Sequence, residues 1–269
     1  KKKKMSDNLT ISEVSLLRDA MQAVGTPAFF DVYQALFRAR VAFGTFLMMR
    51  FDPGQPPSLL DHWIEPGRLR PTALAEYLES TYAFDPFFQY RDRVEGGGVF
   101  RLSDVAPDRF FSSEYYLQYY RGSGLCDEVG LLAPVARGGV AHLSMSRRDA
   151  QGPFRRAELR YLRKYAPLLL ELLTQHCNKI SPAAQDGLVA ARPPLADLIR
   201  NYAKDVLQFA LTAREAQIAG LVLQGHSNSS AAKTLEIATE TCKVHRRNLY
   251  RKLNISSQRD LFGLFKHLL

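Results

Sequence analysis

The sequence feature that most restricts the fold is the C-terminal stretch of residues 211–269. This stretch has the pattern of four short helices joined by tight turns. Thr212 and Glu215 have the spacing of a capping box at a helix start. Gly225 can end that helix, and Ser227 can cap a second helix over residues 228–235. Two further helices are expected, over about residues 240–253 and over residues 258–269. This order of helices and short turns is typical of a helix-turn-helix arrangement.

The third of these helices has one apolar side and one basic side. At about 100° per residue, Cys242, Leu249 and Leu253 fall on the side that we expect to pack on the first two helices. The opposite side carries Lys243, Val244, Arg247, Asn248 and Arg251. No acidic residue follows Glu240 in this helix, so it has the charge and the length of a helix that enters a DNA major groove. A solvated basic face is the alternative.

The basic charge of the chain is concentrated in the same region. Residues 201–269 hold ten Lys and Arg against five Asp and Glu. Lys1–Lys4 precede Met5, a natural start residue, and are set aside, which leaves residues 5–200 with 22 basic and 22 acidic residues. A neutral body with a compact basic segment is typical of a protein that contacts nucleic acid through that segment.

The stretch LTAREAQIAGLVLQGHSNSSAAKTLEIATETCKVHRRNLYRKLNISSQRDL closely resembles the LuxR/GerE/NarL-type DNA-binding domain over about residues 211–261. The resemblance implies base contacts from Lys243, Val244 and Arg247. It implies contacts to the DNA backbone from Thr241, Arg246, Arg251, Asn228 and Ser229. The chain departs from the family pattern at Ala238, where Ser usually opens the recognition helix, so Thr239 caps instead or the first turn is looser.

The last helix has more apolar residues than one small core can bury. By the same resemblance we expect Leu261, Phe265 and Leu268 to contribute to a dimer interface, with burial inside the domain as the alternative. A two-fold dimer implies a pseudo-palindromic DNA site.

The N-terminal body has a mixed helix and strand pattern. Helices are expected over residues 10–40 (two), 72–84, 109–124 and 158–177, and strands over residues 42–51 and 58–66. Residues 128–147 have the pattern of a hairpin that turns at residues 137–139. The fold class is therefore an α/β/α sandwich of the PAS/GAF kind, with an antiparallel sheet, followed by an all-α four-helix helix-turn-helix domain.

Residues 28–175 resemble the autoinducer-binding domain of quorum-sensing LuxR regulators. The resemblance rests on Tyr77 ahead of Asp85-Pro86 and on the stretch from Gly124 through APVARGGVAHLSMSR. It implies that Tyr77 and Asp85 bind the amide and acyl groups of an N-acyl homoserine lactone. The family's lactone-binding Trp aligns near residues 72–73 and a second Trp near Phe100, whereas the only Trp here is Trp63. We therefore expect a pocket formed by Tyr77, Asp85, Phe100 and Trp63 that does not take a standard homoserine lactone.

Eleven aromatic residues lie from Phe84 to Tyr120, which favours either a flat or amphipathic ligand or an ordinary aromatic core. The three cysteines, Cys126, Cys177 and Cys242, are too far apart for paired metal ligands, and no cofactor is expected. Cys126-Asp127 and His142 have no spacing that suggests a nucleophile and base, so no enzyme activity is expected.

The sequence thus predicts a tail over residues 1–9, a ligand-sensing and dimerisation domain over 10–178, a linker over 179–205 rich in Pro, and a DNA-binding domain over 206–269. No apolar run is long enough to span a membrane, and a cytoplasmic location is expected. The predicted function is that of a dimeric, sequence-specific transcription regulator that binds double-stranded DNA and responds to a small molecule. The alternative is an interaction protein that forms mixed dimers with other regulators and inhibits them.

Overall fold

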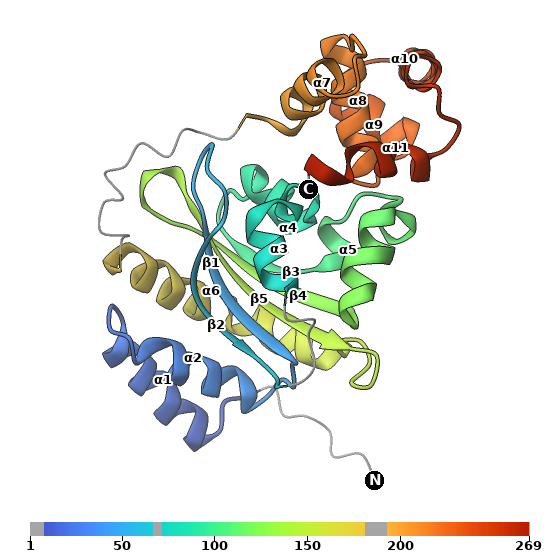
Figure 1. Cartoon of the computed structure of the whole chain (residues 1–269). Helices are drawn as coiled ribbons and strands as arrows, with labels where there is room; N and C mark the ends of the chain where they lie inside the picture. Colours follow the sequence, from blue (N-terminus) through green and yellow to red (C-terminus); the bar gives the residue numbers. More distant parts are fainter. Residues whose placement is uncertain (1–7, 67–71, 181–192, 269) are drawn as a thin grey trace. The chain divides into compact units, whose positions relative to one another are not determined.

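The computed structural model describes residues 8–66, 72–180 and 193–268 (Figure 1). The chain divides into two compact units, which are described separately. The first comprises residues 1–69, 90–104 and 124–190, and the second comprises residues 70–89, 105–123 and 191–269. The domain boundaries drawn from the sequence stay predictions. Most of the predicted tail and the residues 181–192 of the predicted linker lie outside the described residues.

The first unit is built on one antiparallel sheet. Its strands lie in the order β2 (Ser58–Ile64), β1 (Thr45–Phe51), β5 (Val140–Arg148), β4 (Leu125–Pro134) and β3 (Gly98–Arg101) (Figure 1). The predicted strands and the hairpin are confirmed. The hairpin turns through Ala136–Gly138, where Arg137 and Gly138 have positive φ and the Val135 amide donates to the Gly139 carbonyl at 2.9 Å. β3 was not predicted, because it has only four residues and begins at a glycine.

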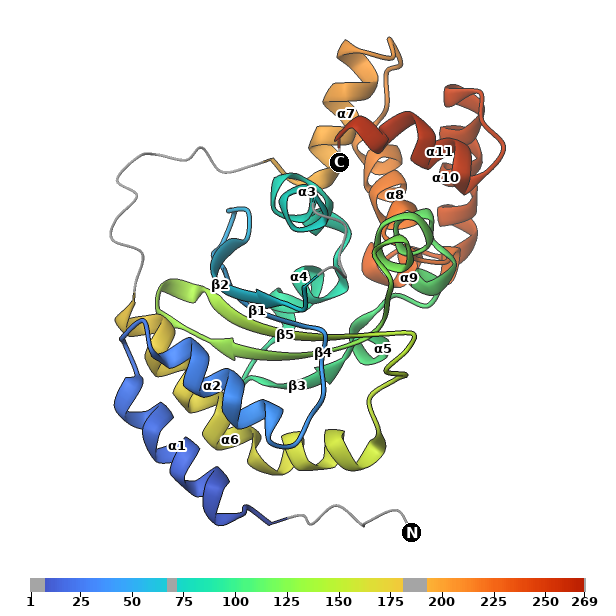
Figure 2. The same cartoon turned by 60° about the horizontal axis from the view of Figure 1, so that its bottom comes forward.

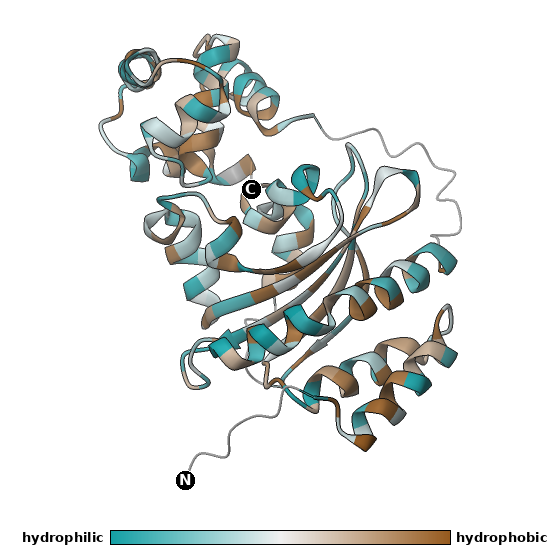
Figure 3. Cartoon of the chain, turned by 180° about the vertical axis from the view of Figure 1, so that it is seen from behind, coloured by the Kyte–Doolittle hydropathy of each residue, from teal (hydrophilic) through white to brown (hydrophobic). Residues whose placement is uncertain are grey.

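Three helices cover one face of this sheet: α1 (Ile11–Ala23), α2 (Phe29–Arg38) and α6 (Arg156–Lys179) (Figure 2). Hydrophobic and hydrophilic residues alternate along these helices, as expected for helices that bury one side (Figure 3). The core between helices and sheet includes Phe29, Phe37, Phe46, Met48, Leu143, Met145, Leu162 and Leu173. The predicted helices over residues 10–40 and 158–177 are thus confirmed.

A buried ion pair links Glu13 of α1 to Arg40, which follows α2. A hydrogen bond from Tyr161 links the same carboxylate to α6. The Glu13 carboxylate, 1% exposed, accepts hydrogen bonds from the Arg40 guanidinium and, at 3.0 Å, from the Tyr161 hydroxyl. Burial by itself raises the pKa of Glu13, but hydrogen bonds from Arg40, Thr10 and Tyr161 outweigh it and lower the pKa to about 2.

Short helices and turns make up most of the remaining described residues before residue 124. They are α3 (Ala73–Glu79), η1 (Thr81–Phe84), α4 (Pro86–Tyr90), η2 (Arg91–Arg93), α5 (Leu102–Val105), η3 (Phe110–Ser112), η4 (Tyr116–Tyr120) and η5 (Arg121–Ser123). The prediction of one helix over residues 109–124 is wrong. Ser113 adopts an extended conformation that ends η3, and the Tyr116 and Tyr120 rings of the following π-turn are stacked and buried.

The C-terminal helices are α7 (Leu195–Asp205), α8 (Ala213–Leu223), α9 (Asn228–Thr234), α10 (Thr239–Leu253) and α11 (Gln258–Phe265), with a final turn η7 (Lys266–Leu268). They enclose a core of their own that includes Ile199, Ile218, Val222, Cys242, Leu249, Leu253, Leu261 and Phe265. The fold class drawn from the sequence is confirmed: an antiparallel sheet with helices, followed by a helical domain. Across the residues with a described structure, none of the helices is both long and apolar enough to cross a membrane.

Candidate nucleic-acid interface

The helix starts around α8 and α9 follow the caps that the sequence predicts. Glu215 N donates to Thr212 Oγ1 at 3.2 Å, and Thr212 N donates in return to the Glu215 carboxylate at 2.9 Å, which completes the capping box. Ser227 caps α9 by accepting from Ser230 N at 3.2 Å. Gly225, between the two helices, has φ of +93°, a conformation that favours glycine. These caps and the glycine fix how α8 leads into α9.

The start of α10 has no such cap. Ala238 occupies the N-cap position in an extended conformation and makes no side-chain hydrogen bond. Thr239 is already the first helical residue, so the prediction that it caps the helix is wrong. The first turn is closed by the Cys242 amide, which donates to the Ala238 carbonyl at 3.0 Å, and the alternative interpretation, a looser first turn, stays a prediction.

The two sides of α10 are separated as the sequence predicts. Cys242 and Leu249 are fully buried and Leu253 is nearly so. The side chains predicted to contact bases, Lys243, Val244 and Arg247, are all exposed, and Val244 is 43% exposed. Val244 thus lies among exposed cations, and an apolar side chain at such a position can contact a thymine methyl group in a groove.

Arg246 is held in position by groups on both helices of the motif. Its Nη1 donates to Asn228 Oδ1 at the start of α9 (3.1 Å), and its Nη2 donates to the Tyr250 hydroxyl one turn along α10 (2.9 Å). The guanidinium also lies 5.1 Å from the centre of the Tyr250 ring. Tyr250 was missed in the sequence, although its spacing of four residues from Arg246 is the signal that could have identified it.

Other predicted backbone contacts lie at the same surface. Thr241, Ser229 and Arg251 are exposed, and Arg251 Nη2 donates to Asn248 Oδ1 at 3.2 Å. Lys252 is different, because its ammonium donates to the buried Glu215 carboxylate at 2.7 Å. Lys252 therefore links α10 to the start of α8 through an ion pair. Arg247 and Arg251 on the same helix are exposed and can contact a polyanion.

The predicted dimer contact on α11 needs a correction. Leu261 and Phe265 are fully buried inside the unit, and the Phe265 ring packs 5.9 Å from the Tyr202 ring of α7. Both side chains therefore belong to the domain core and are not presented to a partner. Leu268, in the final turn, is half-buried.

The structure brings Tyr77 and Asp85 together, as the resemblance implies. The Tyr77 hydroxyl donates to Asp85 Oδ2 at 2.6 Å, and the Phe87 amide donates to Asp85 Oδ1 at 2.8 Å. Asp85 is 7% exposed, and burial raises its pKa to about 6 against the opposing effect of these hydrogen bonds. A buried carboxyl group of this kind can accept a hydrogen bond from a polar group on a ligand.

Phe100 and Trp63 do not share a pocket. Trp63 pairs with Phe46 across the strands and so lies on the helix-covered face of the sheet, where the Arg38 guanidinium stacks 3.8 Å from its ring. Phe100 pairs with Gly130, whose partner on β5 is Ser144, and therefore points to the other face. Its ring packs 5.1 Å from the Tyr90 ring.

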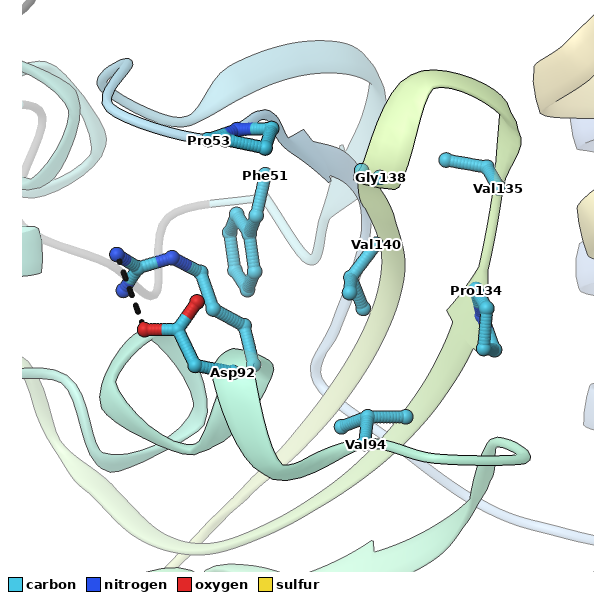
Figure 4. Close-up of a pocket in the computed structure, with 10 residues that line it drawn as sticks. Phe51, Pro53, Asp92, Val94, Pro134, Val135, Gly138 and Val140 are labelled. Carbon is cyan, nitrogen blue, oxygen red and sulfur yellow. Dashed lines mark ion pairs between the residues drawn. The ribbon is translucent and has the colours of Figure 1, made fainter.

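A separate cavity of about 340 Å³ lies at one end of the sheet (Figure 4). Phe51 and Val140 from the strands, Pro53, Val94 and the 134–139 turn line it, together with Arg91 and Asp92, whose charged groups are 3.5 Å apart. None of the four predicted ligand residues lines this cavity.

The side chains considered for catalysis have structural partners. Asp127 Oδ1 and Oδ2 accept from Arg101 and from the Phe154 amide, and His142 is fully buried beside Phe51. Burial lowers the pKa of His142 to about 3. Within the described ranges, no three His, Cys, Asp or Glu side chains are grouped so that they could hold a metal ion.

Comparison with known proteins gives consistent matches. A family described as bacterial regulatory proteins, luxR family, matches residues 210–265. A protein of Aeromonas salmonicida, named as an HTH-type transcriptional regulator encoded in the exeN 3' region, is 34% identical over 187 residues. That match covers 69% of this chain and 95% of the relative.

Two further matches concern the separate parts of the chain. The HTH-type transcriptional regulator MalT of Vibrio campbellii is 44% identical over 59 residues, 22% of this chain and only 6% of MalT. The crystal structure of the VqsR LBD domain from Pseudomonas aeruginosa has a TM-score of 0.53 at 20% identity, and covers 62% of this chain and 97% of that domain. The second likeness concerns the fold alone.

Proposed function

The chain belongs to the luxR family of bacterial regulatory proteins, and from that premise we propose that it is a sequence-specific DNA-binding regulator whose α10 enters the major groove. It is a transcriptional regulator with a ligand-binding-like domain. The observation that carries the proposal is the exposed side of α10, where Lys243, Val244 and Arg247 lie together opposite a fully buried side. Lys and Arg donate to guanine, and an apolar side chain contacts the thymine methyl group.

The backbone contacts divide between the two helices. Arg246, which hydrogen-bonds to Asn228 and Tyr250, contacts a phosphate near the junction of α9 and α10 in this proposal, and Arg251 contacts a phosphate farther along α10. We expect a homodimer, so that two copies of α10 read the two halves of a pseudo-palindromic site.

The proposal is tested by fluorescence anisotropy with duplexes from the regulated upstream region and with random duplexes, at several salt concentrations. Arg247→Ala is expected to cost about 1–3 kcal/mol on the cognate duplex and little on random DNA, because it removes a base contact. Arg251→Ala is expected to weaken binding to both and to reduce the salt slope by about one.

The matched control is Arg18→Ala, which removes an exposed cation of α1 that pairs only with its neighbour Asp19 among the described contacts. This variant should bind both duplexes like the parent protein. Equal losses on cognate and random DNA for Arg247→Ala would contradict a base-reading role, and no binding to any duplex at low salt would contradict DNA binding itself.

We further propose that the Tyr77–Asp85 pair binds a small-molecule signal that is not a standard homoserine lactone. Asp85 is a buried hydrogen-bond acceptor. The Trp that the resemblance implies for lactone binding is absent, because residues 72 and 73 are Thr and Ala. A ligand that reaches Asp85 should raise the melting temperature of the parent protein and not that of Asp85→Ala. The same ligand acting equally on both proteins would exclude this site.

A role as a mixed-dimer inhibitor is the second candidate, favoured by the uncapped start of α10 at Ala238. Size-exclusion chromatography with a co-expressed regulator of the same family tests it. A mixed species that forms while DNA binding by the parent protein is absent would support this candidate over the first.

A further inference from the structure

Four arginine side chains line one cleft of the first unit, called the arginine cleft below. The cleft has a volume of about 480 Å³ and lies where the chain between α2 and β1 meets the end of β5 and the start of α6. Its charged lining residues are Arg38, Arg40, Arg147, Arg155 and Glu158. Four of these five groups are cations, and a cleft lined by charges of one sign concentrates counterions of the other.

Arg147 and Arg40 are offset by carboxylates and form the fixed part of the cleft. Arg147 is 3% exposed, and it donates from Nη2 to Glu158 Oε1 at 2.8 Å and from Nε to the Ala42 carbonyl at 2.7 Å. Arg40 forms the buried ion pair with Glu13. These bonds hold both guanidinium groups in place, and the two carboxylates balance their charges.

Arg38 and Arg155 add two positive charges to the cleft. Among the residues that the structure describes, neither side chain forms an ion pair. The Arg38 guanidinium lies 3.8 Å from the centre of the Trp63 ring and 4.6 Å from that of Phe43, so aromatic stacking fixes its position. Burial lowers the pKa of Arg38, and the charge of Glu65 acts against this effect. The cleft thus holds an excess of two positive charges, one of them on a fixed and partly desolvated group.

We propose that the arginine cleft binds a small molecule through a dianionic phosphate group that contacts Arg38 and Arg155. A phosphate monoester carries about two negative charges at pH 7, which match the two positive charges in excess. Guanidinium groups bind phosphate oxygens through paired hydrogen bonds. Gln151 also lines the cleft and has an amide that can donate to a phosphate oxygen.

This site is separate from those proposed above. The Tyr77–Asp85 pair and the α10 helix belong to the second unit, whereas every residue that lines the arginine cleft belongs to the first. The volume of the cleft is in the range of small-molecule sites and leaves room for more of a ligand than its phosphate group. The inference does not depend on DNA binding.

Trp63 provides a local reporter for the test, because it is the only Trp of the chain and Arg38 stacks on its ring. The full chain is titrated with glycerol phosphate at constant ionic strength while the Trp63 fluorescence is followed. We expect a saturable change in the parent protein. Glycerol, which lacks the phosphate group, should give none, and malonate, a dicarboxylate of the same charge, should bind more weakly.

Arg155→Gln removes one proposed contact and leaves the Arg38–Trp63 stack in place. We expect its binding to weaken about tenfold, as for the loss of a hydrogen bond between charged groups. The matched control is Arg156→Gln, which removes the next cation along the chain, an exposed one that is not part of the cleft lining. It should bind glycerol phosphate like the parent protein. Titration calorimetry gives a second readout, in which the saturable heat should be lost when Arg38→Gln and Arg155→Gln are combined.

The outcomes are distinct. Parent-like binding by Arg155→Gln would overturn the proposal, as would the absence of saturable glycerol phosphate binding in both fluorescence and calorimetry. Equally tight binding of malonate would overturn the assignment to phosphate. DNA anisotropy distinguishes a free ligand from a DNA phosphate: Arg155→Gln should bind duplexes like the parent, and an equal loss for DNA and glycerol phosphate would overturn the small-molecule site. The selective effect of Arg247→Ala on cognate DNA remains a separate test of the proposed function.

Discussion

Glu13 shows how one buried charge contributes to the stability of the first unit. Its pKa of about 2 lies below the ordinary value of 4.5, so the folded state favours the ionised form. This contribution is complete above pH 4.5 and is lost as the pH falls from 4.5 toward 2. Removal of the carboxylate would leave the Arg40 guanidinium without its buried partner.

We predict that Glu13→Gln lowers the free energy of unfolding by about 3 kcal/mol at pH 7. The variant should also have a shallower pH dependence between pH 4.5 and 2 than the parent protein, because it lacks the part that Glu13 contributes. Urea denaturation across this pH range measures both effects. Glu171→Gln, at an exposed position of α6, is the control, and a variant that kept the acid dependence of the parent would contradict the assignment to Glu13.

Tyr250 contributes to DNA binding through Arg246. Tyr250→Phe removes the hydroxyl that accepts from Arg246 Nη2 and keeps the ring, so we predict about threefold weaker binding to cognate and random DNA alike. The salt slope should stay as in the parent, because no charge is lost. Anisotropy titrations at several salt concentrations measure this. A changed slope, or a loss confined to cognate DNA, would indicate a direct contact by Tyr250 instead.

Single residues were predictable where their roles depend on local spacing. The exposed cations of α10 follow from the angle around one helix, and Ser227 follows from its place before a helix start. The roles of Lys252 and Glu13 were not predictable, because their partners are distant in the sequence. Glu215 lies 37 residues from Lys252, and Arg40 lies 27 residues from Glu13.

At the scale of elements, the uncapped start of α10 can be repaired. Ala238 already has the extended conformation of an N-cap, with φ −66° and ψ 144°, so a Ser there can accept from a backbone amide of the first turn. We predict that Ala238→Ser stabilises the second unit by about 0.5–1 kcal/mol. Thermal unfolding followed by helical circular dichroism measures the gain. Ala210→Ser, at an exposed position outside the helices, should give none, and an equal gain from it would contradict capping as the cause.

The sequence predicted whole elements well where caps and periodicity agree, as in α8 and α9, and where periodicity alone is clear, as in α10. It failed between residues 109 and 124, where aromatic packing and the extended Ser113 replace one helix by three short turns. It also missed β3, whose four residues gain strand structure only by pairing with β4. In both places tertiary contacts decide the local conformation.

For the whole molecule, the proposed dimer makes a geometric prediction. Two copies of α10 can enter successive major grooves on one side of the duplex only when the half-sites are separated by about one helical turn. We predict that insertion of about 5 bp between the half-sites weakens binding at least tenfold, and that insertion of about 10 bp restores part of it. Competition binding with these duplexes measures the effect, and equal affinity for all spacings would contradict paired recognition.

Leu268 gives a second test of the dimer. Of the three α11-region residues expected at the interface, Leu261 and Phe265 are buried in the domain core, so only Leu268 is partly exposed. Leu268→Asp should therefore shift the dimer toward monomer in sedimentation experiments while the fold is kept. Leu261→Asp should unfold the domain, because it places a charge in the core.

The uncapped first turn of α10 also has a calorimetric consequence. Because Ala238 has no side-chain acceptor, no cap side chain accepts from the amides of this turn. Phosphate oxygens on a duplex can accept from these amides. Titration calorimetry should accordingly give a more favourable binding enthalpy for the parent protein than for Ala238→Ser, in which the introduced hydroxyl already accepts from one of them.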